Sequence, residues 1–103
     1  MTRPFVYSRE AQAELREIVS YTVKKWGAAQ ARNYARQIDE AATDLATGQG
    51  FFRDWGDVLP GLRVKAAGSH FVFCLLRPEM PALVLAVLHK RMDLMVRLQG
   101  RLA

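Results

Sequence analysis

Apolar residues early in the chain recur every three or four positions, which is the spacing of one face of an α-helix. The recurring positions are Ala11, Leu15, Ile18, Thr22 (through its methyl group) and Trp26. Ser8 is a favourable N-cap before them, and Gly27 supplies a C-terminal stop after them. Residues 3–8 fit a short strand, and Pro4 places it at a sheet edge or at a strand start. The pattern predicts a strand followed by a helix that ends at Gly27.

A second helical pattern runs from about residue 28 to residue 46 and ends at Gly48. Its apolar face consists of Ala31, Tyr34, Ala35, Ile38, Ala42 and Leu45. Because little more than Gly27 separates the two helices, they must turn back on each other as an αα-hairpin. The small alanine side chains on this face allow the helices to approach closely.

The second half of the chain follows β patterns. Residues 62–67 alternate between apolar and basic positions, whereas residues 71–76 and 83–88 are apolar throughout, as central strands are. Gly68-Ser69 predicts a tight hairpin between the first two of these segments. These three segments therefore predict an antiparallel meander.

A short amphipathic helix ends the chain, with Leu94 and Leu98 among its apolar positions. The predicted order is thus β-α-α-β-β-β followed by a helical tail, in one domain over residues 1–103. One helical hairpin can cover one face of an antiparallel sheet. The pattern predicts an α+β fold with the αα-hairpin packed on that sheet.

The alternation in residues 62–67 also predicts which side chains are buried. Leu62, Val64 and Ala66 are expected to face the core, and Arg63 and Lys65 to lie on the other face of the sheet. That second face is expected to be only partly covered. We therefore expect function on the face that carries Arg63 and Lys65.

Residues 48–60 predict a loop, because glycine and proline are frequent there. The loop also holds Phe51, Phe52 and Trp55. Three large aromatic side chains in a loop indicate either a lid over the core or a surface on which a partner docks.

The net charge of the 103-residue chain is +5, and most of the excess lies in its second half. Residues 1–52 carry seven basic and six acidic side chains, whereas residues 53–103 carry eight and four. A basic half indicates an acidic partner, either protein or nucleic acid, although solubility alone also explains it.

No apolar run approaches the roughly 18–20 residues of a membrane span, and the N-terminus does not resemble a signal peptide. The single cysteine, Cys74, excludes an internal disulfide framework and a multi-cysteine zinc site. Its place in a predicted central strand indicates inert burial. These features favour a reducing cytoplasm.

One group of residues could carry chemistry. Arg63, Lys65, His89, Lys90 and Arg91 all lie on strands or strand ends of the predicted sheet. A basic surface with a histidine could cleave RNA, because the histidine would move protons and a cation would stabilise the phosphorane. The favoured interpretation is a basic docking surface on which His89 caps a strand end through hydrogen bonds. His70 is interpreted as a turn residue whose ring bonds to the backbone.

The chain resembles the ParE toxins of bacterial type II toxin–antitoxin systems, within the wider RelE/ParE superfamily. The resemblance is carried by short segments in family order: Ser8, Ala11, Glu14-Leu15 and Ile18; Tyr21; Trp26-Gly27; Ala31 and Tyr34; Gly61-Leu62-Arg63; Gly68-Ser69-His70 and Phe73; and Val87-Leu88-His89 with Arg91-Met92-Asp93. The chain departs from the family where Cys74-Leu75 replaces a common Tyr-Arg pair, and in the aromatic-rich loop 48–60.

This resemblance implies a non-enzymatic toxin that inhibits DNA gyrase. No cofactor is expected, and no metal is expected because His70 and His89 are the only histidines and no thiolates cluster beside them. The resemblance also implies a ParD-like antitoxin that binds the toxin directly in a hetero-oligomer and supplies the DNA-binding half of the repressing complex. A RelE-like, ribosome-dependent mRNA endonuclease is the alternative function, and an inactive toxin that only binds antitoxin is a third.

Antitoxin tails are typically acidic and fold on binding, which suits a basic surface. The expected contact residues for antitoxin or target are Arg63, Lys65, His89, Arg91, Arg97 and Arg101. The basic tail is the region expected to touch gyrase, because no predicted element needs its charges.

Overall fold

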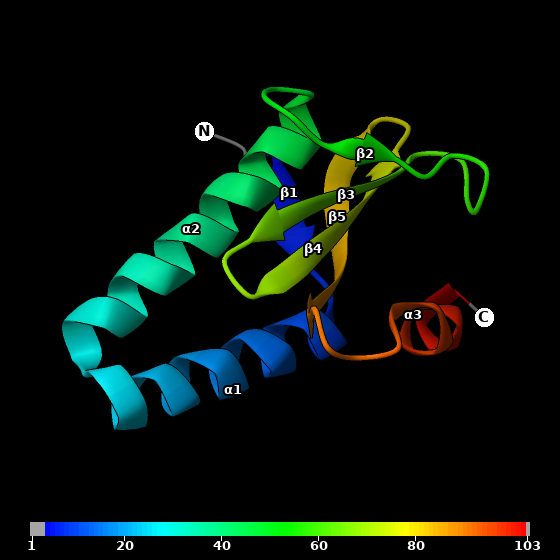
Figure 1. Cartoon of the computed structure of the whole chain (residues 1–103). Helices are drawn as coiled ribbons and strands as arrows, with labels where there is room; N and C mark the ends of the chain where they lie inside the picture. Colours follow the sequence, from blue (N-terminus) through cyan, green and yellow to red (C-terminus); the bar gives the residue numbers. More distant parts are fainter. Residues whose placement is uncertain (1–3, 103) are drawn as a thin grey trace.

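The computed structural model describes residues 4–102 as a strand, a pair of long helices, four further strands and a terminal helix (Figure 1). The elements are β1 (Phe5–Tyr7), α1 (Arg9–Trp26), α2 (Ala28–Thr47), β2 (Arg53–Asp54), β3 (Leu62–Ala67), β4 (His70–Arg77), β5 (Met80–His89) and α3 (Leu94–Leu102). This arrangement confirms the predicted α+β class and order. The expected strand start at residue 3 lies outside the described residues.

The helix boundaries follow from the capping residues that the sequence supplies. The Ser8 hydroxyl accepts a 3.1 Å hydrogen bond from the Ala11 amide and so caps α1. Gly27 lies at φ +92°, where it ends α1 and begins α2. Gly48 ends α2 in the left-handed conformation. The predicted αα-hairpin is confirmed.

The five strands form one mixed sheet in the order β1-β5-β4-β3-β2. The meander from β3 to β5 is antiparallel, as predicted, whereas the edge strand β1 pairs with β5 in parallel through Phe5↔Ala82, Val6↔Leu83 and Tyr7↔Val84. The edge strand β2 lies within the predicted loop and pairs with the start of β3. The sequence did not predict β2, because a strand of two residues is too short to show an alternating pattern.

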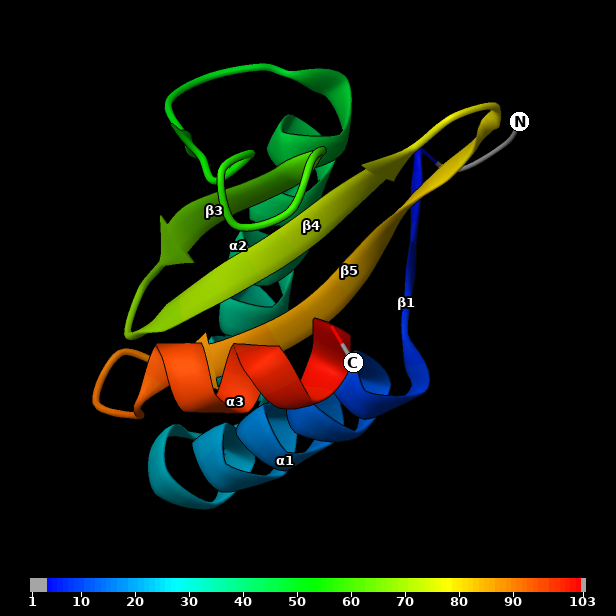
Figure 2. The same ribbon diagram turned by 90° about the vertical axis from the view of Figure 1, so that its right-hand side faces the viewer.

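Helices cover both faces of the sheet. Figure 2 shows α2 behind the sheet and α3 in front of it. The face toward α1 and α2 forms one core around residues such as Ile38, Leu45 and Val72. The face toward α3 forms a second core, in which Leu98 is fully buried against strand residues that include Phe73. The terminal helix is therefore an integral layer of the fold.

This two-sided core reverses the predicted orientation of β3. Leu62 and Val64 are buried as expected, but they belong to the core beneath α3. Arg63 and Lys65 lie on the face toward α2, where both bond to that helix or to the loop after it. The expectation of a partly covered basic face was therefore wrong, because alternation separates two faces without saying which one the helices take. Ala66, expected inside, is exposed.

The aromatic residues of the 48–60 segment divide between the two cores and solvent. Phe52 packs against the first core, and Trp55 lies edge-on to Phe73 of the second core at 5.7 Å between ring centroids. Phe51 is 94% exposed. The lid interpretation thus holds for Phe52 and Trp55. Within residues 4–102, no helix is both long enough and apolar enough to cross a membrane.

Candidate functional site

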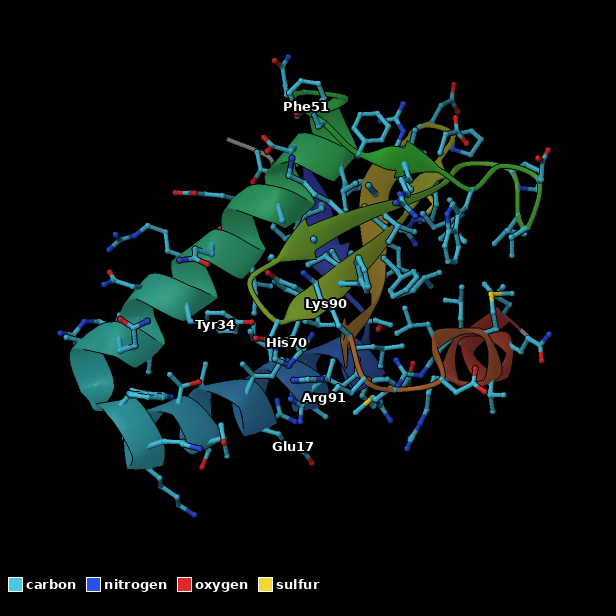
Figure 3. All side chains as sticks on the ribbon, viewed as in Figure 1. Glu17, Tyr34, Phe51, His70, Lys90 and Arg91 are labelled. Carbon is cyan, nitrogen blue, oxygen red and sulfur yellow. The ribbon has the colours of Figure 1, made fainter. Side chains whose placement is uncertain are left out.

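A groove with a volume of about 1270 Å³ runs along α1, between this helix and the ends of β4 and β5. Tyr34 of α2 and the β3–β4 hairpin close one end, and residues of α3 and of the segment before it line the other. Figure 3 shows Tyr34, His70, Arg91 and Glu17 around this region, each from a different element. The groove brings together segments that are far apart in the sequence.

Two exposed aromatic residues of α1 line the groove. Tyr21 is 60% exposed and Trp26 is 66% exposed. The predicted apolar stripe placed Trp26 in the core, and this expectation was wrong. The last turns of α1 extend beyond the sheet toward the turn that joins α1 to α2 (Figure 1). None of the described strands lies against these turns. Large apolar side chains left in a groove favour contact with another molecule.

Tyr34 holds the closed end of the groove together through its hydroxyl group. This oxygen accepts a 2.8 Å bond from the Ser69 amide, lies 3.1 Å from the Ala67 carbonyl oxygen and lies 2.7 Å from Nδ1 of His70. Gly68 makes this approach possible, because a Cβ atom there would collide with the Tyr34 ring. His70 therefore bonds to a tyrosine side chain, and the expected ring-to-backbone bond was wrong.

His70 and His89 are cross-strand neighbours, with ring centroids 5.1 Å apart. Burial lowers the pKa of His70, and the nearby His89 lowers it further, while Glu14 opposes both effects. His89 accepts a 3.0 Å bond at Nδ1 from the Arg91 amide. The predicted role of His89 as a cap at a strand end is thus confirmed.

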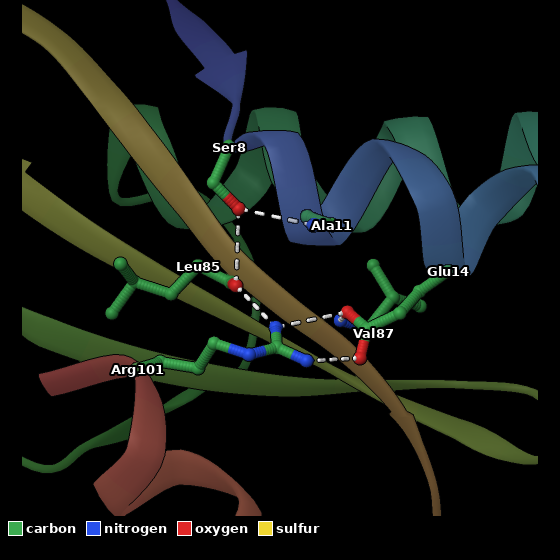
Figure 4. Close-up of polar contacts among 6 residues, drawn as sticks. All are labelled: Ser8, Ala11, Glu14, Leu85, Val87 and Arg101. Carbon is green, nitrogen blue, oxygen red and sulfur yellow. Dashed lines mark hydrogen bonds and ion pairs between the residues drawn. The ribbon is translucent and has the colours of Figure 1, made fainter.

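A bidentate ion pair connects α1 to α3 beside the groove (Figure 4). Nη2 of Arg101 lies 2.7 Å from Oε2 of Glu14, and Nη1 lies 3.2 Å from Oε1. Glu14 also accepts a 3.0 Å bond from the Val87 amide, and Arg101 donates a 2.9 Å bond to the Leu85 carbonyl. The hydrogen bond to Glu14 raises the pKa of Arg101. The expectation that no element needs the tail charges was therefore wrong for Arg101.

The other predicted contact residues fall into two groups. Arg63 donates a 2.8 Å bond to the Leu45 carbonyl in the last turn of α2 and lies 4.7 Å above the Phe52 ring. Lys65 donates a 2.7 Å bond to the Phe51 carbonyl and lies 3.5 Å from Asp44. Arg63 and Lys65 thus stabilise the fold near the C-terminus of α2.

His89, Arg91 and Arg97 line the groove instead, on the other side of the molecule from that helix end. Arg91 and Arg97 are exposed, and within residues 4–102 neither guanidinium makes a hydrogen bond or an ion pair. Lys90 lies 5.4 Å from the Phe71 ring centroid. The five basic residues expected on one surface are therefore not brought together.

His70, His89 and Cys74 are each held or buried within the chain. Nδ1 of both groove histidines is engaged within the chain, and Arg63 lies too far along the sheet to assist either ring. Cys74 is buried, which raises its pKa to about 11 and leaves the thiol protonated. Among the described residues, no three His, Cys, Asp or Glu side chains could hold a metal ion.

The sequence reasoning missed the groove face of α1. Glu10, Glu14 and Glu17 are spaced i, i+4, i+7, so one side of α1 carries a row of carboxylates. This spacing was visible in the sequence. The sequence did not show that this row of carboxylates faces Arg91 and Arg97. Those residues are more than seventy positions away, and only the folded chain brings them to the groove.

Comparison with known proteins gives consistent matches over nearly the whole chain. Residues 5–94 match a family model described as the ParE toxin of the type II toxin-antitoxin system parDE. The chain is 47% identical over 98 residues to Toxin ParE of Escherichia coli, covering 95% of both proteins. It is 37% identical over 93 residues to Toxin ParE1 of Mycobacterium tuberculosis, covering 90% of this chain and 95% of the relative.

A solved structure described as the chromosomal ParDE TA system from P. aeruginosa also resembles the fold. The TM-score is 0.65 at 20% sequence identity, and the match covers 82% of this chain and 92% of the other. At this identity the likeness concerns the fold alone.

Proposed function

The chain belongs to the ParE toxin family and is the toxin of a ParDE type II toxin–antitoxin system; we propose that it inhibits DNA gyrase and that a ParD-like antitoxin neutralises it by direct binding. In this proposal the toxin binds gyrase without turning over a substrate, and it acts in the cytoplasm. DNA recognition in the complex belongs to the antitoxin.

The observation that carries this proposal is the set of open binding groups around the groove and on α3. Tyr21 and Trp26 expose large apolar surfaces, while Arg91 and Arg97 have no partner within the described chain. The histidines beside them are held by Tyr34 and by the Arg91 amide. Such an arrangement favours recognition of a protein surface, in which aromatic and arginine side chains contribute most of the binding energy.

The outer face of α3 is the proposed contact with gyrase. Leu98 fixes the helix on the sheet, and this leaves Met95 and Val96 exposed, at 43% and 64% of their surfaces, beside Arg97. An apolar patch with an adjacent cation is typical of a protein-binding face. Arg101 contributes by holding α3 in place, since its guanidinium is bonded to Glu14.

A supercoiling assay with purified toxin and gyrase tests the proposed target. Gyrase activity is expected to fall as toxin approaches equimolar amounts, with linear DNA accumulating. Val96→Asp and Arg97→Glu are expected to weaken inhibition, whereas Arg36→Glu on the exposed face of α2 is the charge-matched control. Full activity at a large molar excess of folded toxin would exclude that gyrase as the target.

The alternative of RNA cleavage is tested on translating ribosomes. It requires His89→Ala or Arg63→Ala to abolish mRNA cleavage by the toxin. Arg63 is bonded to α2 far from His89, so we expect neither substitution to act on chemistry. Unchanged growth when the toxin is expressed without antitoxin would instead support an inactive toxin that only binds antitoxin.

A further inference from the structure

The groove along α1 has one acidic wall and one basic wall. Glu10, Glu14 and Glu17 project from α1, and Arg91, Arg97 and Arg101 line the groove on the other side. Lys25 also lines the groove from the last turn of α1, where its ammonium group bonds to the Tyr21 hydroxyl at 3.2 Å. The net charge of +5 does not reveal this division, because the acidic row lies within the nearly neutral first half of the chain. A molecule in this groove therefore meets opposite charges on its two flanks.

Most of these charges have no partner within residues 4–102. Glu14 and Arg101 form the bidentate pair described above. Across the part of the chain that the structure describes, Glu10, Glu17, Arg91 and Arg97 form no side-chain ion pair, and all four residues are exposed. Figure 3 shows Glu17 on α1 and Arg91 beyond the end of β5, and both residues line the groove. Both signs of charge remain available to a partner.

The lining between these walls is suited to a helix. The groove follows α1 from Glu10 to Trp26, a length of about 24 Å at 1.5 Å per residue. Ala13, Ile18 and Tyr21 provide a small residue and apolar ridges against which a second helix can pack. An extended segment would need free backbone groups on β5, but Glu14 already occupies the Val87 amide.

We propose that the groove binds an amphipathic helix of the antitoxin that carries basic side chains on the flank facing Glu10 and Glu17 and acidic side chains on the flank facing Arg91 and Arg97. This inference rests on the proposed neutralisation by direct binding. It refines the expectation of a typically acidic antitoxin tail at this surface. A uniformly acidic helix would place carboxylates against Glu17, and like charges at an interface select against a partner.

A phage-displayed helix library tests the charge pattern directly on the toxin. Each 18-residue helix has a fixed leucine and alanine stripe, while both flanks are randomised among Lys, Glu, Gln and Ser. Selection on the wild-type chain is expected to enrich helices with opposite charges on their two flanks. Both helix directions satisfy this expectation, because turning the helix end for end exchanges its flanks.

Charge reversal in the toxin then assigns each flank to its wall. Glu17→Lys is expected to replace basic with acidic residues opposite position 17, while Glu10 still selects basic residues at its own end of that flank. This variant should bind the wild-type helices roughly tenfold more weakly. Arg91→Glu combined with Arg97→Glu is expected to select basic residues on both flanks. On the exposed face of α2, Glu40→Lys is the charge-matched control for the first variant. Arg32→Glu combined with Arg36→Glu is the charge-matched control for the double arginine variant, and both controls should select the wild-type pattern.

Several results would overturn the proposal. These are wild-type selection of flanks with a single sign, selection with no charge preference, and no enrichment of any helix on the wild-type chain. Enriched helices that bind unchanged to both Ala13→Trp and Tyr21→Ala would lie outside the groove, which also contradicts it. Gyrase inhibition is measured separately on the same preparations, so failure of the charge pattern is distinguishable from failure of the proposed toxin function.

Discussion

The two ends of the sheet both carry basic side chains but use them differently. Beside the C-terminus of α2, Arg63 bonds to the Leu45 carbonyl and Lys65 bonds to the Phe51 carbonyl. At the groove, the guanidinium groups of Arg91 and Arg97 have no partner within residues 4–102. Arg63 and Lys65 therefore stabilise the fold, whereas Arg91 and Arg97 are available for binding. Whether a charge is already paired therefore says more about its function than its sign does.

The largest expected difference concerns the ion pairs of the two regions. Glu14→Ala removes the carboxylate that pairs with Arg101 and accepts a hydrogen bond from the Val87 amide. The two side chains of this ion pair are only 18–19% exposed. We expect the free energy of unfolding to fall by about 2–3 kcal/mol. Asp44→Ala breaks the more exposed 3.5 Å contact with Lys65 and should cost less than about 1 kcal/mol. Urea denaturation compares the variants, and equal losses would contradict this difference.

A smaller effect separates the structural arginine from the groove arginine. Arg63→Ala loses a bond to the end of α2 and the contact with Phe52, so we expect a loss of about 1–2 kcal/mol. Arg91→Ala should change stability by no more than about 0.5 kcal/mol, because its side chain is exposed and has no partner among the described residues. Thermal and urea unfolding measure both values. A destabilising Arg91→Ala would show that the groove arginine also belongs to the fold.

The stability of the protein should also depend on pH through His70, at the end of the groove near Tyr34. Since folding lowers the pKa of His70, the unfolded chain binds the proton more readily. The free energy of unfolding should therefore decrease as pH falls below about 6.5 toward the lowered pKa of the folded state. His70→Gln should flatten this dependence in urea denaturation between pH 5 and 8.

His89→Gln supplies the companion measurement. Removing His89 should raise the His70 pKa observed by NMR, because the positive charge of His89 is one cause of its depression. An unchanged His70 titration in this variant would assign the depression to burial alone.

The smallest expected effect compares the two tryptophans. Trp26→Phe should leave stability within about 0.5 kcal/mol, because the side chain is 66% exposed. The remaining Trp55 should be quenched weakly by acrylamide, since it packs against Phe73. In Trp55→Phe, the remaining Trp26 should be quenched strongly. Equal quenching of the two residues would show that Trp26 is covered.

Local sequence signals placed the elements well because each signal acts over a few residues. Ser8, Gly27 and Gly48 marked the helix boundaries through caps that the structure contains. The bounds of β3 coincide with the alternating segment 62–67. The parallel pairing of β1 with β5 could not be read in this way, because it joins residues almost eighty positions apart.

Local signals predicted less well which face of the sheet each side chain occupies and which residues meet at the groove, because both depend on contacts between distant segments. Arg63 was expected on an open face because basic residues in a strand are usually solvated. Its guanidinium instead donates a hydrogen bond to the Leu45 carbonyl at the end of α2. His89 was identified correctly as a strand-end cap. The opposition of Glu17 to Arg91 depends on how α1 lies against the end of β5, which no local pattern contains. That opposition is the part of the site that only the fold provides.

The side chains that cover the edge of β5 also bear on how the protein behaves at high concentration. Beyond Val84 the strand no longer has β1 beside it, and an uncovered edge of this kind templates the addition of foreign strands. Ser8 and Arg101 occupy the Leu85 carbonyl, and Glu14 occupies the Val87 amide. The fold thereby blocks edge-to-edge association of chains at this position and so disfavours aggregation at high concentration.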